Sequence, residues 1–394
     1  MSVMARMDAP VLLYDGACGF CRRSVERMRA RTGDRVSYEP YQTAAARFPE
    51  VPVQECRRAI QLIEADGSRA QAADAFFRAL AHGGKRSGLL LYRRLPGFAL
   101  LAEALYRLVA ASRGPLHLLD RALYGEFVAA PGQERVRGLF LSFLAGVYLL
   151  AFLSLGEQVL GLFGERGITP ARELLPWVEQ RLDGPRLLRY PTLFWWLGAG
   201  DGSLVGVCVA GCVLSLPPLF GFLRLPCLLL LWPLYLSLFT IGQHDFLTFQ
   251  WDTLLLETGF LALFWARGSR ATPWLLRFLL FRLVFASGLL KITSGDHAWW
   301  TDLTALSFHY ETQPLPTPLA WYAHQLPGWA HRACTAGTLF LEVVVPFLIL
   351  LPRGPRLWAF WALVGLQLLI ALTGNYGFFN LIAIALCLTL LDDG

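Results

Sequence analysis

The sequence has little charge: Asp, Glu, Lys and Arg together make up 16% of its 394 residues, against roughly 25% in an average soluble domain. It also contains no fixed-period repeat and no low-complexity tract. Apolar residues make up 55% of the chain, and the mean hydropathy is +0.45. Since this composition is too apolar for an ordinary soluble protein, the sequence predicts a membrane protein whose partner is the lipid bilayer.

The sequence lacks a basic arm and a basic patch interleaved with aromatic residues, with which proteins follow a nucleic-acid backbone. Residues 1–138 nevertheless hold 21 Lys and Arg against 14 Asp and Glu, a net charge of +7, whereas residues 139–394 hold 14 against 15, a net charge of −1. We therefore expect no nucleic-acid partner and attribute the surplus to the positive-inside bias. Residues 1–10 contain no apolar core for a signal peptide, so the N-terminal part is expected to be cytoplasmic.

The eight cysteines form no disulfide framework. Five of them lie in apolar segments, where a thiol behaves as a small apolar side chain; they are Cys208, Cys212, Cys227, Cys334 and Cys387. Only Cys18, Cys21 and Cys56 lie in the N-terminal part, and the first two form a Cys-x-x-Cys pair.

Residues 1–115 are predicted to form a small α/β domain. Short apolar runs bounded by turn residues predict strands, and apolar residues at helical spacing predict helices. A charged, amphipathic connector over 116–138 is expected to follow. The expected strands are 10–15, 35–41 and 58–67, and the expected helices are 18–32, 72–84 and 96–114; the last would cover the sheet or rest on the bilayer.

The stretch "VLLYDGACGFC" sets the cysteine pair at the start of the first helix. The helix N-terminus lowers the pKa of a cysteine in the first turn, and the thiolate is the form that attacks disulfides. Cys18 is predicted to occupy that position, and Cys21, one turn later, to resolve the mixed disulfide. Asp15 and Gly16 are expected to make the turn before the helix, and Arg22 to add positive charge.

Two other interpretations of the pair remain open. Half of a zinc site would need two further ligands, and only Cys56, His82 and His117 are available nearby, none of them in a second spaced pair. The two cysteines are alternatively inert helix residues. Redox chemistry is favoured, with the cysteine pair itself as the redox group, no further cofactor and no metal.

The motif "YDGACGFC", with the later segments "PYQ" and "ADAFFRAL", resembles the DCC family of thiol-disulfide oxidoreductases over residues 9–115. The resemblance implies a thioredoxin-like fold and dithiol–disulfide exchange at Cys18 and Cys21. Its substrate would be a protein or small-molecule thiol or disulfide, which implies a protein-disulfide reductase activity.

From Leu139 onward, apolar segments recur between polar breaks and predict an all-α polytopic bundle over 139–394. We expect about eight spans, although several are short of the roughly 20 residues that a bilayer requires. They are placed near 139–163, 203–223, 225–241, 252–266, 274–291, 334–352, 357–372 and 376–391.

Charged residues within spans are costly, so they are expected to be paired or functional. Arg282 and Glu342 are expected at similar depth in the predicted spans, which would allow them to pair. Lys291 is expected near the outer face, at the level of Asp252 and Glu257. These residues either form ion pairs that hold helices together or form a site for acid–base chemistry.

The predicted outer loops supply further candidates. "GQHDFLTFQWD" contains His244 and Asp245, and "GNYGFFN" contains Asn375. Because no His-x-His or His-x-x-x-His spacing occurs, a metal site is not expected there either.

The segments "FLTFQWDTLLLETGFLALF", "LLRFLLFRLVFASGLLKITSGD", "HYETQPLPTPLAWYAHQLP" and "LTGNYGFFNLIAIALCL" resemble the lipase maturation factor family, over residues 139–391. The resemblance implies a chaperone-like role for an exported lipase client. Eukaryotic members carry a large C-terminal soluble domain, whereas this sequence stops at "LLDDG". The fused thiol domain suggests a multi-pass protein of the bacterial inner membrane.

Two hypotheses follow. In the first, the chain is an enzyme, a membrane-anchored thiol-disulfide oxidoreductase. In the second, it is a non-catalytic membrane maturation factor for lipases or other secreted proteins. Transport or membrane-embedded chemistry near Asp252, Glu257, Arg282 and Lys291 is a third and weaker interpretation.

Overall fold

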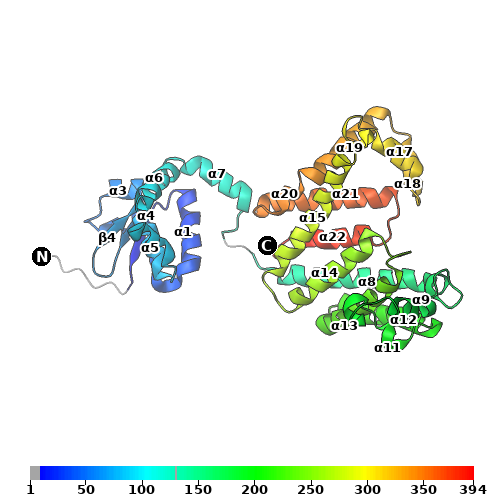
Figure 1. The fold of residues 1–394 in the computed structure, drawn as a ribbon. Helices are drawn as coiled ribbons and strands as arrows, with labels where there is room; N and C mark the ends of the chain where they lie inside the picture. Colours follow the sequence, from blue (N-terminus) through cyan, green and yellow to red (C-terminus); the bar gives the residue numbers. More distant parts are fainter. Residues whose placement is uncertain (1–8, 129–130) are drawn as a thin grey trace. The chain divides into compact units, whose positions relative to one another are not determined.

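The computed structural model describes residues 9–128 and 131–394. The chain divides into two units, Met1–Pro131 and Gly132–Gly394, and each is described by itself (Figure 1).

The N-terminal unit contains a mixed four-stranded sheet in the order β2-β1-β3-β4. β1 (Val11–Tyr14) is parallel to β2 (Ser37–Pro40) and antiparallel to β3 (Gln61–Ile63), which pairs antiparallel with β4 (Arg69–Gln71). The first three strands lie where the sequence predicts strands. The sequence pattern misses β4 because its three residues, "RAQ", contain a single apolar side chain and follow directly on a turn.

Helices cover both faces of this sheet (Figure 1). Because side chains alternate along a strand, Leu12 packs on one face with Val25 of α1 and Ala75 of α4. Val11 and Leu13 pack on the other face among side chains from the α2 and α3 region. The helices of the unit are α1 (Gly19–Thr32), α2 (Tyr41–Ala44), α3 (Val53–Arg58), α4 (Ala72–His82), α5 (Ser87–Arg94), α6 (Phe98–Ala111) and α7 (Arg113–Tyr124).

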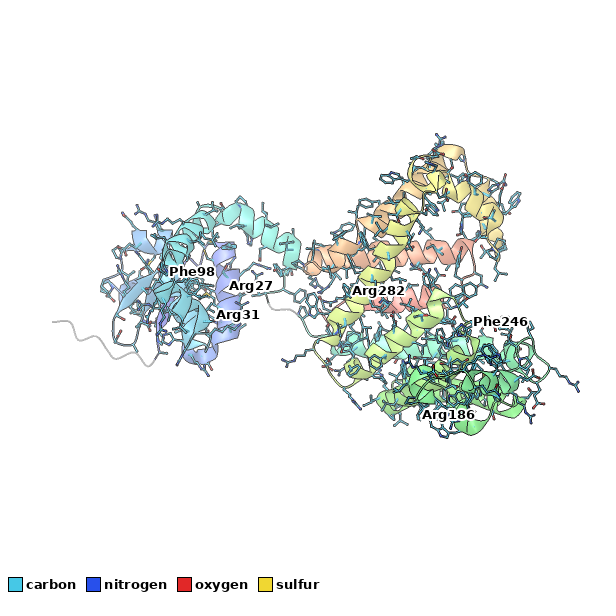
Figure 2. The ribbon with its side chains drawn as sticks, in the orientation of Figure 1. Arg27, Arg31, Phe98, Arg186, Phe246 and Arg282 are labelled. Carbon is cyan, nitrogen blue, oxygen red and sulfur yellow. The ribbon has the colours of Figure 1, made fainter. Side chains whose placement is uncertain are left out.

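Helix α7 occupies the first part of the segment expected to be a connector. Its Asp120 is buried and forms ion pairs with Arg23 and Arg27 of α1. The side chains of α1 that carry these charges face α7, and Figure 2 labels Arg27 among them. The folded N-terminal unit therefore extends beyond residue 115. The boundary expected from the sequence falls too early because Asp120 has the pattern of a surface charge.

The second unit is helical. Its elements are α8 (Glu134–Phe163), α9 (Ala171–Glu179), α10 (Arg186–Arg189), α11 (Phe194–Leu197), α12 (Asp201–Leu219), α13 (Arg224–Gly242), α14 (Gln250–Ala266), α15 (Thr272–Thr293), α16 (His297–Trp300), α17 (Ala305–Thr312), α18 (Pro318–His324), α19 (Gly328–Val343), α20 (Pro346–Ile349), α21 (Arg353–Thr373) and α22 (Phe379–Leu388).

All eight predicted spans lie on helices, but within the described residues only five helical segments are long and apolar enough to cross a membrane. They are Glu134–Phe163, Asp201–Leu219, Arg224–Gly242, Gly328–Ile349 and Arg353–Thr373. Of the other three, α14 has 17 residues and α22 has 10, which at 1.5 Å per residue fall short of the roughly 30 Å hydrocarbon layer. Helix α15 is long enough, but it carries Arg277, Arg282 and Lys291.

Residues Asp392 and Asp393 form hydrogen bonds with the first residues of α21 and α8. Asp393 accepts hydrogen bonds from the backbone N–H groups of Glu134 (2.7 Å), Arg135 and Val136 (both 3.1 Å), the first residues of α8. It thus satisfies N–H groups that have no partner within a helix. Asp392 accepts from Arg353 and Arg356 at the start of α21, at 3.0 and 2.9 Å.

Candidate functional site

The two N-terminal cysteines lie at the start of α1, as the sequence predicts. Cys18 is the residue before the helix, in an extended conformation, and its Sγ accepts a hydrogen bond from the Cys21 N–H at 3.4 Å. Its carbonyl accepts from the Arg22 N–H at 3.0 Å. Both cysteines are half-buried free thiols. The geometry therefore directs one backbone N–H group, that of Cys21, at the Cys18 sulfur.

The turn before Cys18 is fixed by a side chain from the next β-α junction. Gln42 donates from Nε2 to the Asp15 carboxylate at 2.7 Å and accepts from the Gly16 N–H at 3.0 Å. Asp15 also accepts from the Ala17 N–H at 3.0 Å. Gly16 is required for close approach, because an added Cβ would lie 2.8 Å from Cβ of Pro40.

Cys21 is half-buried in the first turn of α1. Burial, together with the hydrogen bond to Cys18, raises the pKa of the Cys21 thiol to about 12, while the positive charge of Arg113 acts in the opposite direction. The guanidinium of Arg113 is held by the carbonyl oxygens of Arg57 and Arg58, at 3.2 and 2.6 Å. Cys21 therefore stays protonated at neutral pH.

An apolar cavity of about 400 Å³ lies behind Cys21. Its walls come from α1, α4 and α6, with Phe20, Phe77 and Phe98 among the lining residues; the rings of the last two are 6.0 Å apart, and Figure 2 labels Phe98. The Tyr106 hydroxyl at this wall accepts from the Ile60 N–H at 3.0 Å. A ligand in this space would meet mainly hydrocarbon and aromatic surface next to the thiols of Cys21 and Cys56.

The charges near the pair differ from those expected. Arg22 lies exposed, and the positive charge that acts on Cys21 comes from Arg113. His117 of α7 packs against the first turn of α1, since an added Cβ at Gly19 would lie 2.8 Å from its ring. Gln42, Arg113 and His117 are distant in sequence from the cysteines. Of the three, only Gln42 lies in a segment that the motif comparison singled out, "PYQ".

The predicted pairing of Arg282 with Glu342 is wrong. Arg282, labelled in Figure 2, forms an ion pair with Glu257 of α14. Glu342 instead pairs with Lys291, whose Nζ lies 2.7 and 2.6 Å from its two carboxylate oxygens and 3.0 Å from the Ser287 hydroxyl. Depth along a span does not specify which way a side chain points around the helix, and here rotation decides the partner.

The remaining predicted residues do not gather into one site. Asp252 is buried and accepts from the Tyr235 hydroxyl at 2.5 Å. His244 and Asp245 lie in the loop before α14. The side chain of Asn375 accepts from the Gly377 N–H at 3.0 Å and so stabilises its own turn. Within residues 9–128 and 131–394, no group of three or more His, Cys, Asp or Glu side chains is suitable for a metal ion.

Two family models match this chain. Residues 12–118 match the DCC1-like thiol-disulfide oxidoreductase, and residues 135–394 match the lipase maturation factor transmembrane domain. The chain belongs to the lipase maturation factor family. Both resemblances drawn from the sequence motifs are thus confirmed, and this member of the family carries a thiol-oxidoreductase-like region ahead of its membrane region.

Curated relatives of the family agree. Lipase maturation factor 2 of Xenopus tropicalis is 46% identical over 289 residues, and that of Homo sapiens is 47% identical over 294 residues; each match covers 66% of this chain and 40% of the relative. Lipase maturation factor 1 of Bos taurus is 37% identical over 276 residues, 65% of this chain and 49% of the relative. The chain therefore spans less than half the length of these relatives. No solved structure matches it.

Proposed function

We propose that this protein is a membrane-anchored thiol-disulfide oxidoreductase that works through Cys18 and Cys21. The observation that carries the proposal is the Cys18 sulfur at the start of α1, 3.4 Å from the Cys21 backbone nitrogen, with the Cys21 thiol enclosed behind it. The mixed sheet supports a thioredoxin-like fold, since a parallel β1-α1-β2 unit is followed by the antiparallel pair β3-β4 and then by α4.

The exchange proceeds in two displacements. The Cys18 thiolate attacks one sulfur of a substrate disulfide, and the other sulfur leaves as a thiolate that takes up a proton. Cys21 then loses its proton to solvent and attacks the Cys18 sulfur, which forms the Cys18–Cys21 disulfide and releases the second substrate thiol. One substrate disulfide is reduced and one cysteine pair is oxidised; an external dithiol restores the pair.

Substitution of single cysteines in the full chain tests this. With insulin as substrate and a dithiol as donor, we expect Cys18→Ser to abolish reduction. Cys21→Ser is expected to accumulate a mixed disulfide with substrate, seen by mass spectrometry. Cys334→Ser is the matched control, because this exposed cysteine lies in the other unit and its loss should change neither result. Wild-type reduction by Cys18→Ser would refute the proposal.

A second function is favoured by the membrane unit: assistance in the maturation of an exported lipase or another secreted protein. It is supported by the identity of 46–47% with proteins named lipase maturation factor 2. The test is the yield of active secreted lipase from a host that lacks the chain, complemented with wild type or Cys18→Ser. Full rescue by Cys18→Ser would show that the thiols and the maturation role are independent.

We further propose that the protein lies in a bacterial inner membrane with eight spans and a cytoplasmic N-terminal unit. The net charge of +7 over residues 1–138 supports this orientation. Helices α14, α15 and α22 would have to supply the three spans beyond the five candidate segments. A cytoplasmic thiol site and an exported client would lie on opposite sides of the membrane, so the two units would act separately.

A further inference from the structure

Helix α6 is apolar on nearly all sides, but it is covered on one side only. Phe98 and Tyr106 line the cavity, whereas Leu100 is 80% exposed and Leu108 is 64% exposed. Leu101 and Leu105 border the cavity and are themselves 66% and 57% exposed. Such a composition is typical of a helix that is buried all round, so the exposed side of α6 is expected to have a partner.

The neighbouring helices expose the same residue type. Leu90 and Leu91 of α5 and Leu118 of α7 are between 47% and 69% exposed, and α5 and α7 both contact α6. Soluble domains rarely leave so many large apolar side chains in water, and clusters of them indicate a protein or membrane contact.

Charge distinguishes between these two partners. Residues 85–125 hold seven Lys and Arg against two Asp and Glu, a net charge of +5. Both acids are engaged within the unit: Asp120 pairs with Arg23 and Arg27, and Glu103 accepts from the Tyr92 hydroxyl at 3.0 Å. The exposed arginines at 93, 94, 107 and 121 are therefore available to an external anion. Leucines combined with arginines are typical of helices that bind anionic lipid surfaces.

The chain also restricts where these helices can go. Nine residues separate Tyr124, the last residue of α7, from Glu134, the first residue of the candidate span α8. A fully extended chain of this length reaches about 35 Å. Lipid headgroups are consequently present near α5–α7 at high effective concentration.

We propose that α5, α6 and α7 lie on the surface of an anionic lipid bilayer, with the exposed leucines inserted among the lipids and the arginines at the headgroups. This goes beyond the proposed function, because it does not depend on thiol chemistry. It also places the rim of the apolar cavity, at Leu101 and Leu105, in contact with lipid.

Site-specific photo-crosslinking of the full chain tests the contact. A benzophenone amino acid replaces Leu100 or Leu108, neither of which lines the cavity, and the protein is reconstituted in nanodiscs of phosphatidylglycerol. The matched control is Asp66, which is exposed at the β3–β4 turn. We expect lipid adducts, identified by mass, at least several-fold more abundant at the two leucine positions than at Asp66. Equal yields, or crosslinks to residues 132–394 or to a second copy in place of lipid, would overturn the proposal.

Charge reversal tests the electrostatic part with the same label at Leu108. Arg93→Glu with Arg94→Glu is expected to lower the adduct yield in phosphatidylglycerol discs, by up to about fivefold for each arginine, and to have little effect in phosphatidylcholine discs. Arg31→Glu, at an exposed position of α1, is the control and should leave the yield unchanged. Yields that are unaffected by the double reversal would contradict the assignment to anionic lipid.

Discussion

At the scale of single residues, the two cysteines share the start of α1, and Cys21 lines the apolar cavity. Cys18 and Cys21 could be selected from the sequence, since Cys-x-x-Cys after a short strand is a local pattern. Gln42, Arg113 and His117 could not be ranked in the same way, because the chain between them and the cysteines is long and leaves no local pattern. A sequence indicates such partners only when the fold is already known.

The pH dependence of alkylation is the first prediction at this scale. Because burial raises the pKa of Cys21 to about 12, its thiol should react slowly with iodoacetamide at pH 7–9 and faster as the pH approaches about 12. Site-resolved mass spectrometry of the reduced wild-type chain measures this with Cys18, which contributes to the raised pKa of Cys21, still in place. A model peptide with one free cysteine, added to the same sample, provides the comparison. Reaction of Cys21 at pH 8 as fast as that of the peptide cysteine would contradict the prediction.

The same shift has a consequence for stability. Between the pKa of an unfolded cysteine, roughly 8.5, and about 12, the unfolded state releases a proton that the folded state retains. The contribution of Cys21 to the free energy of unfolding is therefore fully present below about pH 8.5 and is lost as the pH rises toward about 12.

The pair formed by Lys291 and Glu342 supports a second prediction. Glu342 is buried at 9% side-chain exposure, so removal of its partner leaves an uncompensated charge. We expect Lys291→Met to destabilise the protein by about 3–5 kcal/mol. The double variant with Glu342→Gln should recover most of that loss.

Thermal unfolding of the purified chain in one detergent gives the comparison. Arg172→Met is the control, since Arg172 and Glu165 are exposed outside the expected spans and their pair should contribute about 1 kcal/mol or less. Additive losses from Lys291→Met and Glu342→Gln would show that the two charges do not interact.

At the scale of elements, most of the fold follows from local pattern. The spacing of apolar residues located three strands, the helices α1, α4 and α6, and the apolar helices of the second unit, because burial of one face imposes a period that the sequence records. β4 and the packing of α7 were not predicted. A three-residue strand is too short to show a periodic pattern, and an ion pair between two helices leaves no pattern in the local sequence. Whether a helix spans a bilayer also depends on its neighbours, as the charged α15 illustrates.

The start of α8 gives a prediction at this scale. Asp393→Ala removes three hydrogen bonds to backbone N–H groups and should cost about 1–2 kcal/mol, within the range for loss of a helix cap. Asp393→Asn keeps an acceptor and should cost less. The midpoints of thermal unfolding of the two variants show which of them loses more stability. An equal loss for both would mean that Asp393 stabilises α8 through its charge alone.

At the scale of the whole molecule, the orientation of the N-terminal unit determines whether its cysteines can react with thiols of the cytoplasm or with thiols outside it. If that unit is cytoplasmic, a membrane-impermeant maleimide should label Cys18 in inverted inner-membrane vesicles and leave it unlabelled in spheroplasts. Cys18→Ser corrects for labelling of other cysteines. Labelling from the outer side would reverse the proposed topology and would bring the thiol site together with exported clients.

The exposed leucines of α5–α7 also affect how the protein can be handled. A shortened chain that ends near residue 128 would keep Cys18 and Cys21 but would put these side chains in bulk water, where they would associate between copies. Such a preparation would elute as polydisperse aggregates unless a mild surfactant or a small disc of phospholipid replaced the missing cover. Kinetic work on the thiols therefore belongs in a lipid-containing buffer from the first step.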